Sequence, residues 1–377
     1  MANWVGLTAT TFAEYIKGEE VGVMRNHKIL GMLQDRGRVS FNHSGLNMVW
    51  DVRYRRAPMQ GFADSDTLTF ARQNRHKQVT LPWRGYTITD SFTDFEKEQN
   101  KGDTAIVKYV ALKSKHLLED INEQFGETEC YVDGNASGND KRFHGIESFL
   151  STSGASTKQP IGLPNDTYGG LSATLGTAGG NWSTTGTTTT ATDWPTGTGD
   201  AQYDYWSPLI VDYTSTISTS DAAGTYGWAA ATKTWPNTCV EATRYLITHS
   251  QKNKSKHGEL DLITIESRMY RQLKDKAHAE EGIYVTRGSP DGVYKLGFKD
   301  VINLDGIDVT SEYGIASNVG YGWNFDSIEI CSLLGSMFMP EGPDRDISGQ
   351  AYRFAVKIMG NFKYASPRGF GKLINVT

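Results

Sequence analysis

The sequence predicts an α+β chain with more than one lobe, and three observations support this. Its 377 residues exceed what a single hydrophobic core usually holds. Segments with alternating apolar residues occur near both ends, whereas the segments between them carry amphipathic helical patterns. Hydrophobic residues make up 38% and charged residues 21%, which is typical of a globular protein and not of a fibrous or disordered chain.

The first 36 residues show little periodicity and are expected to form an extended arm, with one short helix near residues 11–17. A basic region followed by an apolar core is missing from this segment, so no secretory signal peptide is predicted. The chain also has no run of about 18 apolar residues, so no membrane span is predicted.

Residues 37–92 are expected to form a long two-stranded excursion. Apolar residues alternate with polar ones on both legs: Met48, Trp50, Val52 and Tyr54, then Val79, Leu81 and Trp83, with Tyr86 and Ile88 after Gly85. An isolated hairpin is only marginally stable in water. Trp50 and Trp83 therefore need a surface to lie on, either on the same chain or on a neighbouring copy.

Residues 93–155 are expected to contain the longest helix, over residues 104–125. Asp103 is the predicted N-cap and Gly126 the predicted C′ residue. Ile106, Val110, Leu117 and Ile121 lie on one stripe of this helix. At about 1.5 Å per residue the helix would be roughly 33 Å long, enough to form the backbone of a domain.

Residues 156–340 are expected to form a mixed α/β lobe, with a Thr/Gly-rich loop at 168–200. A capping box of Thr238 and Glu241 predicts a helix from there to about residue 253. A short strand at 260–264 follows, and Thr264 is a candidate cap for a second helix that runs to about residue 280.

The last third of the chain is expected to return to strands. Short apolar stretches predict strands at 294–298, 307–310 and 328–331. The clearest alternation is that of Tyr352, Phe354, Val356 and Ile358. Residues 341–377 are expected to return to the lobe that holds the long helix.

The sequence lacks the common motifs of enzyme chemistry. None of the eight histidines forms a metal-ligand pair at helical spacing. Leu373 stands where a phosphate-binding loop ending in Gly371–Lys372 needs Ser or Thr. Cys130, Cys239 and Cys331 are far apart and are expected to be buried free thiols. No catalytic residue, cofactor or metal is predicted, and an undetected hydrolase remains an alternative that an activity screen would test.

The charge pattern is more informative. A net charge of −5 and a pI of about 5.9 are unlike those of a protein that mainly grips a phosphate backbone. Basic residues gather on the excursion and acidic residues follow it, so the basic part of one copy could lie over the acidic part of the next. The alternative is two solvated faces. The candidates for contact between subunits are Trp50, Arg53, Arg55, Arg56, Lys77, Trp83, Asp94, Glu96 and Glu98.

Taken in order, these parts resemble the major capsid proteins of tailed double-stranded-DNA bacteriophages, whose fold was first seen in a Hong Kong phage. Several stretches carry the resemblance: the long helix, Tyr168–Leu171, Trp206–Pro208, residues 260–264 followed by residues 267–270, and residues 360–373 near the end of the chain. The Thr/Gly-rich stretch at 171–200 departs from that pattern.

The resemblance implies an N-arm at 1–36, an E-loop at 37–92, a P-domain with a spine helix at 93–155, an A-domain at 156–340 and a return to the P-domain at 341–377. It implies self-assembly into hexamers and pentamers of an icosahedral capsid that encloses double-stranded DNA without sequence-specific binding. The implied partners are a portal protein, a separate scaffolding protein and, as a further candidate, a decoration protein. The protein would lie in the virion after assembly in the host bacterial cytoplasm.

Two other functions stay open at this point. The first is an encapsulin-like cargo shell, which shares the capsid fold. The second is a virion surface or receptor-binding protein, because the Thr-, Gly- and Trp-rich residues 168–236 are suited to presenting a sugar-binding face.

Overall fold

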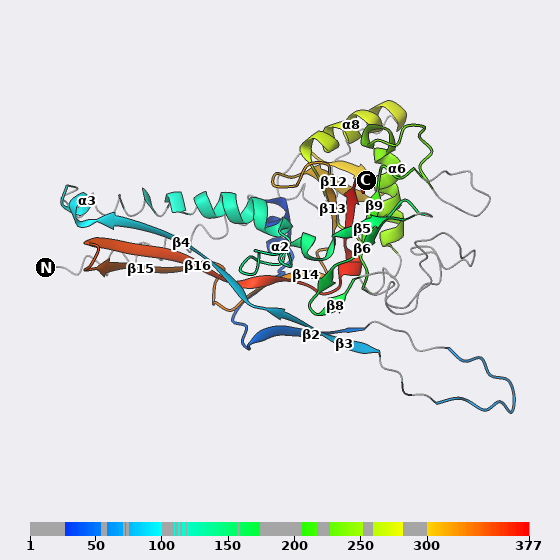
Figure 1. Ribbon diagram of the computed structural model, residues 1–377, viewed down its shortest axis with the longest axis horizontal. Helices are drawn as coiled ribbons and strands as arrows, with labels where there is room; N and C mark the ends of the chain where they lie inside the picture. Colours follow the sequence, from blue (N-terminus) through cyan, green and yellow to red (C-terminus); the bar gives the residue numbers. More distant parts are fainter. Residues whose placement is uncertain are drawn as a thin grey trace.

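The computed structural model describes residues 27–53, 59–70, 72, 75–99, 109, 112–113, 115–117, 119–156, 159–173, 206–216, 227–251, 259–281 and 300–376. These residues form an elongated lobe of strands beside a helix, a compact lobe around a second sheet, and a hairpin that projects from the body (Figure 1). The predicted α+β class is confirmed. The predicted helix near residues 11–17, most of the Thr/Gly-rich loop and the predicted strand at 294–298 lie outside the described residues.

A five-stranded sheet forms the elongated lobe, and its longest strand is β16 (Ala351–Tyr364). Strand β4 (Arg84–Thr93) pairs with one edge of β16, while β15 (Met339–Asp346) and β14 (Ile328–Ser332) pair with the other. β1 (Val39–Ser40) adds to β14. The alternation predicted for β16 is confirmed, because Tyr352, Phe354, Val356 and Ile358 are all buried.

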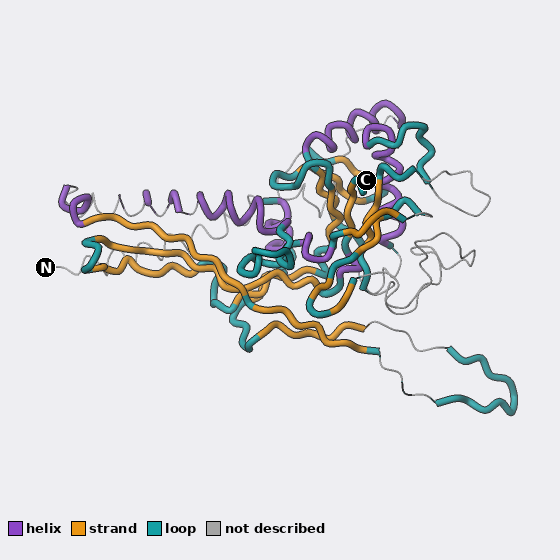
Figure 2. Tube along the Cα trace, viewed as in Figure 1, coloured by secondary structure: helices purple, strands orange, loops and turns teal. Residues whose placement is uncertain are grey.

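The spine helix lies along this sheet (Figures 1 and 2). Tyr109 and residues 112–113, 115–117 and 119–121 are α-helical, whereas the predicted start at Asp103 lies outside the described residues. The ring of Phe92 on β4 stacks on Tyr352 with centroids 5.1 Å apart and meets Tyr109 edge-on at 6.1 Å. Apolar and aromatic contact thus joins the spine helix to the sheet.

The predicted end of this helix at Gly126 is wrong. The chain continues through a π-helical turn, η1 (Asn122–Gly126), and a 3-10 turn, η2 (Glu129–Tyr131). Gly126 does not have positive φ, so it does not act as a C′ residue. A Cβ at this position would lie 2.1 Å from the ring of His27. Gly126 is therefore required by close packing against His27.

The compact lobe contains a six-stranded sheet in the order β11-β12-β10-β13-β17-β9. Its strands are β11 (Ile302–Leu304), β12 (Ile307–Ser311), β10 (Leu262–Ile265), β13 (Gly320–Trp323), β17 (Gly371–Ile374) and β9 (Leu209–Asp212). Helices α6 (Trp235–Ser250) and α8 (Ser267–Glu281) pack against each other and against this sheet. The turn η4 (Pro367–Gly369) leads from β16 to β17, so one segment joins the two sheets.

The two helix caps predicted in this lobe are wrong. α6 begins at Trp235, and Thr238 donates a hydrogen bond to the Tyr213 carbonyl at 2.8 Å inside the buried first turn. The hydroxyl of Thr264 accepts a hydrogen bond from the Trp323 indole at 2.8 Å. Glu266 caps α8 instead, because its carboxylate accepts hydrogen bonds from the backbone of residues 268 and 269. Long-range partners outcompete the local capping pattern at both sites.

The projecting hairpin consists of β2 (Asn47–Arg53) and β3 (His76–Pro82), which pair antiparallel with Trp50 opposite Val79. The predicted excursion included Tyr86 and Ile88, but these residues lie on β4 and therefore in the five-stranded sheet. The sheets also cross the predicted bounds 156–340 and 341–377. β14, within the first range, lies in the five-stranded sheet, and β17, within the second, lies in the six-stranded sheet. Apolar residues fall on odd positions up to Trp83 and on even positions from Tyr86, so the phase of the alternation shifts at the boundary between β3 and β4.

Short elements complete the structure. Helix α2 (Lys28–Asp35) precedes β1, and α3 (Asp94–Gln99) follows β4 at the far end of the elongated lobe. The 3-10 turn η3 (Ile146–Phe149) leads into two pairs of short strands: β5 (Thr152–Ala155) with β6 (Gly162–Pro164), and β7 (Thr167–Tyr168) with β8 (Leu171–Ser172).

Candidate assembly surfaces

The root of the hairpin rests on its own chain. The inward residues Met48, Val52, Val79 and Leu81 are buried in the main core, whereas the alternate residues face solvent. The backbone N–H of Thr80 donates to the carbonyl of Gly169 in the turn between β7 and β8, at 3.1 Å. A fixed root gives the projecting part of the hairpin a defined direction.

Both tryptophans predicted to need a surface find part of it on the same chain. Trp50 donates its indole N–H to the Ala365 carbonyl at 3.2 Å, and its ring lies 6.3 Å from that of Tyr168. Trp83 donates to the Gly45 carbonyl at 3.0 Å. Both rings are half-buried and pack against the main core. Of the two alternatives for these residues, the structure supports the same chain, and a further contact with a neighbour stays a prediction.

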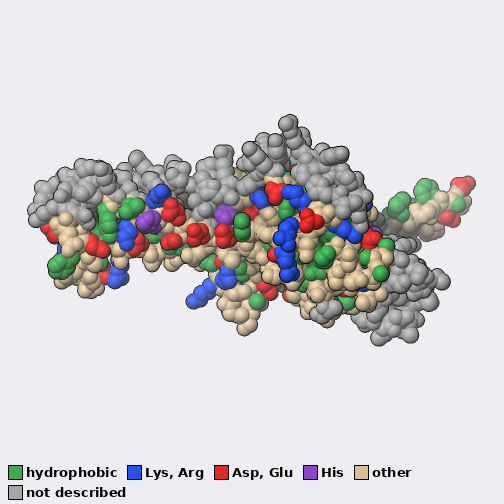
Figure 3. Space-filling model, turned by 90° about the horizontal axis from the view of Figure 1, so that it is seen from above, with side chains coloured by type: hydrophobic (Ala, Val, Ile, Leu, Met, Phe, Trp, Pro, Cys, Tyr) green, Lys and Arg blue, Asp and Glu red, His purple; other side chains and the backbone are tan. Residues whose placement is uncertain are grey.

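The tip of the hairpin, residues 59–70, exposes large apolar side chains that sequence reasoning did not single out. Met59 is 99% exposed, Phe62 75% and Phe70 92%. The side-chain amide of Gln60 bonds to both the N–H and the carbonyl of Thr69, at 3.0 and 2.7 Å, which joins the two legs. Figure 3 shows this tip extending beyond the body with hydrophobic and acidic side chains. Large exposed apolar side chains gathered in this way make the tip a candidate interaction surface.

The charged contact candidates lie at opposite ends of the molecule. Arg53 and Lys77 are exposed on the hairpin, whereas Asp94, Glu96 and Glu98 lie on α3 at the far end of the elongated lobe (Figure 1). Arg55 and Arg56 lie outside the described residues. This separation places the two groups too far apart to meet within one chain in the described arrangement, so a contact between them would have to join two copies.

Two of the acidic candidates also have a role within the chain. The Asp94 carboxylate pairs with Arg345 at 3.0 Å. Glu96 accepts a hydrogen bond from the N–H of Thr93 at 2.9 Å, and the Thr93 hydroxyl accepts one from the N–H of Glu96 at 3.2 Å. This reciprocal pair is a capping box, which explains why α3 begins directly after β4.

An acidic groove lies next to α3 on the same lobe. It has a volume of about 500 Å³ and is lined by Thr89, Asp90, Ser91, Glu341, Asp344, Arg353, Phe354 and Ala355. These residues come from β4, β15 and β16. This groove could not be predicted from the sequence, because Asp90 is about 250 residues from Glu341 and Asp344. The carboxylates come together only because β4 and β15 both pair with β16.

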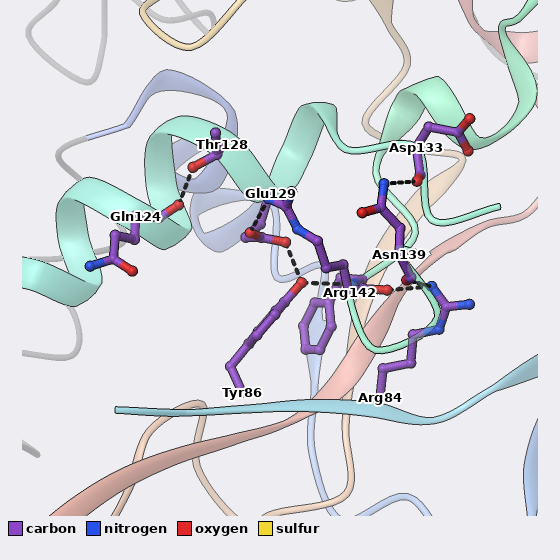
Figure 4. Close-up of polar contacts among 9 residues, drawn as sticks. Arg84, Tyr86, Gln124, Thr128, Glu129, Asp133, Asn139 and Arg142 are labelled. Atoms are coloured by element: carbon purple, nitrogen blue, oxygen red, sulfur yellow. Dashed lines mark hydrogen bonds and ion pairs between the residues drawn. The ribbon is translucent and has the colours of Figure 1, made fainter. Parts of the chain in front are cut away.

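A polar cluster fixes the end of the spine helix to β4 (Figure 4). Tyr86 donates its hydroxyl proton to Glu129 and accepts a hydrogen bond from the N–H of Phe143 at 2.6 Å. Arg142 pairs with the other oxygen of Glu129 at 2.7 Å. Burial and then the carboxylate of Glu129 raise the pKa of Tyr86 well above its usual value. The hydroxyl therefore stays protonated and continues to donate.

Arg84, two residues before Tyr86 on β4, holds the loop that follows the helix. Its guanidinium donates to the carbonyls of Gly134 at 2.9 Å, Asn139 at 3.1 Å and Arg142. Nearby, burial and then the charge of Arg84 lower the pKa of His144 to about 3. His144 is therefore a neutral residue of the core.

A second buried cluster joins α2, the spine helix and the compact lobe. The Glu312 carboxylate lies 4.0 Å from His27 and 3.9 Å from Lys28, and it is 9% exposed. Burial raises the pKa of Glu312 to about 7, while Lys28 lowers it and Glu127 raises it further. Burial also lowers the pKa of Lys28. Burial thus disfavours the charged form of both Glu312 and Lys28.

No helix among the described residues is long and apolar enough to cross a membrane. The three cysteines are free and buried, as predicted. No protein-family model and no curated protein sequence matches this chain.

Solved structures do match it. The capsid asymmetric unit of cyanophage A-1(L) superposes with a TM-score of 0.57 over 93% of this chain and 92% of that one, at 12% sequence identity. The capsid of a native GTA particle superposes with a TM-score of 0.50 over 91% and 89% of the two chains, at 11% identity. The likeness extends over about nine-tenths of each chain, and it shows that this chain has the fold of these capsid proteins.

Proposed function

We propose that this chain, which has the capsid fold of tailed phages, is the major capsid protein of a double-stranded-DNA bacteriophage. In this role it assembles with copies of itself into the hexamers and pentamers of a closed icosahedral shell. It acts as a structural component of the virion and catalyses no reaction there. The fold is supported by the two capsid structures, and the assembly is proposed here for this chain.

One observation carries the proposal: the hairpin projects from a firmly seated root and ends in exposed Met59, Phe62 and Phe70. Such a tip is costly for a monomer, because exposed apolar surface favours association. A neighbouring copy that covers it would gain about 25 cal/mol per Å² of apolar surface removed from water.

The arrangement also suits a ring. Contacts between different surfaces of neighbouring copies close into rings when the rotation fits. The hairpin tip and α3 lie at opposite ends of the molecule. Each copy can therefore offer one surface to the copy before it in the ring and the other surface to the copy after it. A subunit held by several such contacts is retained by multivalency even when each contact is weak.

In this proposal residues 1–36 form the N-arm, 37–92 the E-loop, 93–155 the P-domain, 156–340 the A-domain and 341–377 the return to the P-domain. These bounds follow the chain order and not the sheets, since β4 belongs to the five-stranded sheet and β17 to the six-stranded one. The further partners are a portal protein, a separate scaffolding protein and a decoration protein, with assembly in the host cytoplasm and double-stranded DNA inside the shell.

Electron microscopy of the purified recombinant chain, alone and together with candidate scaffolding proteins, tests the proposal. We expect uniform closed particles. Nucleic-acid and protein analysis of particles from infected cells then separates a capsid, which contains double-stranded DNA, from a cargo shell, which contains an enzyme. A trimer or monomer that binds glycans would instead identify a receptor-binding protein and would refute the shell function.

A further inference from the structure

A histidine, a glutamate and a cysteine meet at the root of the hairpin. Each of His43, Glu329 and Cys331 offers one ligand atom, and these atoms lie within 4.8 Å of one another. Glu329 and Cys331 come from β14, whereas His43 lies in the linker between β1 and β2. His43 is almost 290 positions from the other two residues in sequence, so no sequence motif indicated the cluster.

The surroundings of the cluster form a small cavity. It has a volume of about 290 Å³, and His43, Cys331, Trp50, Trp83 and Lys363 are among the residues that line it. The thiol of Cys331 is buried, while the Glu329 side chain is 32% exposed. The site thus combines a protected sulfur ligand with an open side through which an ion can enter.

We propose that this cluster is a binding site for a divalent transition-metal ion of the zinc type. Imidazole nitrogen, thiolate sulfur and carboxylate oxygen are the ligands that Zn²⁺ takes in proteins. Three protein ligands leave a fourth tetrahedral position for water. The ligand atoms must close by roughly 1 Å, since tetrahedral ligands lie about 3.3–3.8 Å apart at the usual bond lengths of about 2.0–2.3 Å.

The neighbours of the cluster already orient its ligands. Ser40 Oγ lies 2.7 Å from a ring nitrogen of His43 and 3.6 Å from the Cys331 sulfur. The backbone N–H of His43 donates to the Ser332 carbonyl at 3.1 Å, which fixes the linker against β14. Hydrogen bonds of this kind around metal ligands set their orientation and affinity.

Lys363 would compete with a metal ion for the carboxylate of Glu329. Its ammonium lies 3.0 Å from one oxygen of Glu329 and 5.9 Å from the centre of the Trp50 ring. An incoming dication must displace or repel this charge. Removing the ammonium should therefore tighten metal binding by on the order of tenfold, which distinguishes a metal site from an ordinary ion pair.

A bound ion would join the linker of the hairpin to β14, at the point where the hairpin leaves the body. Metal binding would be a property of the purified chain, so it goes beyond the proposed function and can be measured without any shell being formed.

Titration of the reduced full-length chain with Co²⁺ tests the site. We expect one equivalent to bind with a thiolate-to-cobalt charge-transfer band, and Zn²⁺ to displace it. The band should disappear in Cys331→Ser and persist in the matched variants Cys130→Ser and Cys239→Ser, whose thiols are buried elsewhere. Lys363→Met should bind Co²⁺ more tightly.

His43→Ala keeps the test decisive if Cys331→Ser fails to fold, because His43 lies in a partly exposed linker. We expect it to weaken Co²⁺ binding by roughly 10–100-fold. Absence of the band from the folded parent chain at millimolar Co²⁺ would overturn the proposal. So would a band that persists in folded Cys331→Ser, or unchanged affinity in His43→Ala.

Discussion

Tyr86 joins the spine helix to the sheet through a single hydroxyl group. In Tyr86→Phe, Glu129 loses a hydrogen-bond donor and the N–H of Phe143 loses its acceptor. Glu129 is only 8% exposed, so water cannot fully replace the lost partner. We expect a loss of about 1–3 kcal/mol in the free energy of unfolding, measured by urea denaturation.

The matched control for this residue is Tyr313→Phe, because Tyr313 is 78% exposed. We expect it to change the free energy of unfolding by less than about 0.5 kcal/mol. Equal stabilities of the two variants would contradict the role given to Tyr86.

Glu312 makes stability depend on pH. Its pKa is about 7 in the folded chain, against an ordinary value of 4.5, so the folded state binds the proton more tightly than the unfolded state. Stability from this residue is therefore full at low pH and is lost as pH rises from about 4.5 to about 7, by up to about 3 kcal/mol.

Glu312→Gln removes this titration and keeps the shape of the side chain. We expect the variant to gain stability relative to the parent chain as pH rises from 5 to about 8, measured by urea unfolding at each pH. Glu119→Gln, whose side chain is 57% exposed, serves as the control. A difference between Glu312→Gln and the parent that stays constant with pH would rule out the raised pKa.

These residue contacts were beyond prediction from the sequence. Tyr86 and Glu129 are 43 positions apart, and either residue alone is unremarkable in its local pattern. Gly126 was interpreted as a helix end because glycine commonly follows one, yet its real partner is the ring of His27. Local patterns report propensity, whereas these positions are decided by packing between distant segments.

The hairpin is the element on which assembly depends in this account. Phe62 and Phe70 are 75% and 92% exposed, so replacing both with serine removes little packing within the chain. We expect Phe62→Ser/Phe70→Ser to retain its unfolding free energy within about 1 kcal/mol and to lose particle formation, measured by sedimentation velocity and electron microscopy. Tyr313→Ser, exposed on the body of the molecule, is the control that should still assemble.

Charge on the same element gives an independent prediction. Reversing Arg53, Arg55 and Arg56 to Glu should block assembly and leave the monomer folded, because it places like charges opposite α3 of the next copy. Adding Glu98→Lys to that variant should restore part of the assembly. Normal particles from the triple reversal, at low salt, would refute the proposed contact between the hairpin and α3.

At the level of elements the sequence was informative where period two or long helical periodicity dominated. The strand with Tyr352, Phe354, Val356 and Ile358 and the legs of the hairpin were predicted from alternation alone and are confirmed. Which strands pair was not predictable. β4 follows the hairpin with period-two alternation of its own, but it pairs with β16, about 270 residues later.

The two proposed contact surfaces lie far apart on the molecule, with a stiff body between them. β16 runs the length of the elongated lobe and continues through η4 into the compact lobe, while the spine helix follows the same sheet (Figure 1). A stiff body with a projecting hairpin holds the two neighbouring copies at a fixed distance and orientation. The order of these parts was visible in the sequence, but the exposed tip and the acidic groove required the fold.

The central claim is that the hairpin tip finds its binding surface on another copy of the chain. A high-resolution electron cryomicroscopy map of assembled particles measures this directly. The account predicts closed particles in which the Met59, Phe62 and Phe70 side chains are buried against an adjacent subunit. Particles in which the tip extends freely into solvent, or a chain that stays monomeric under every assembly condition, would contradict it.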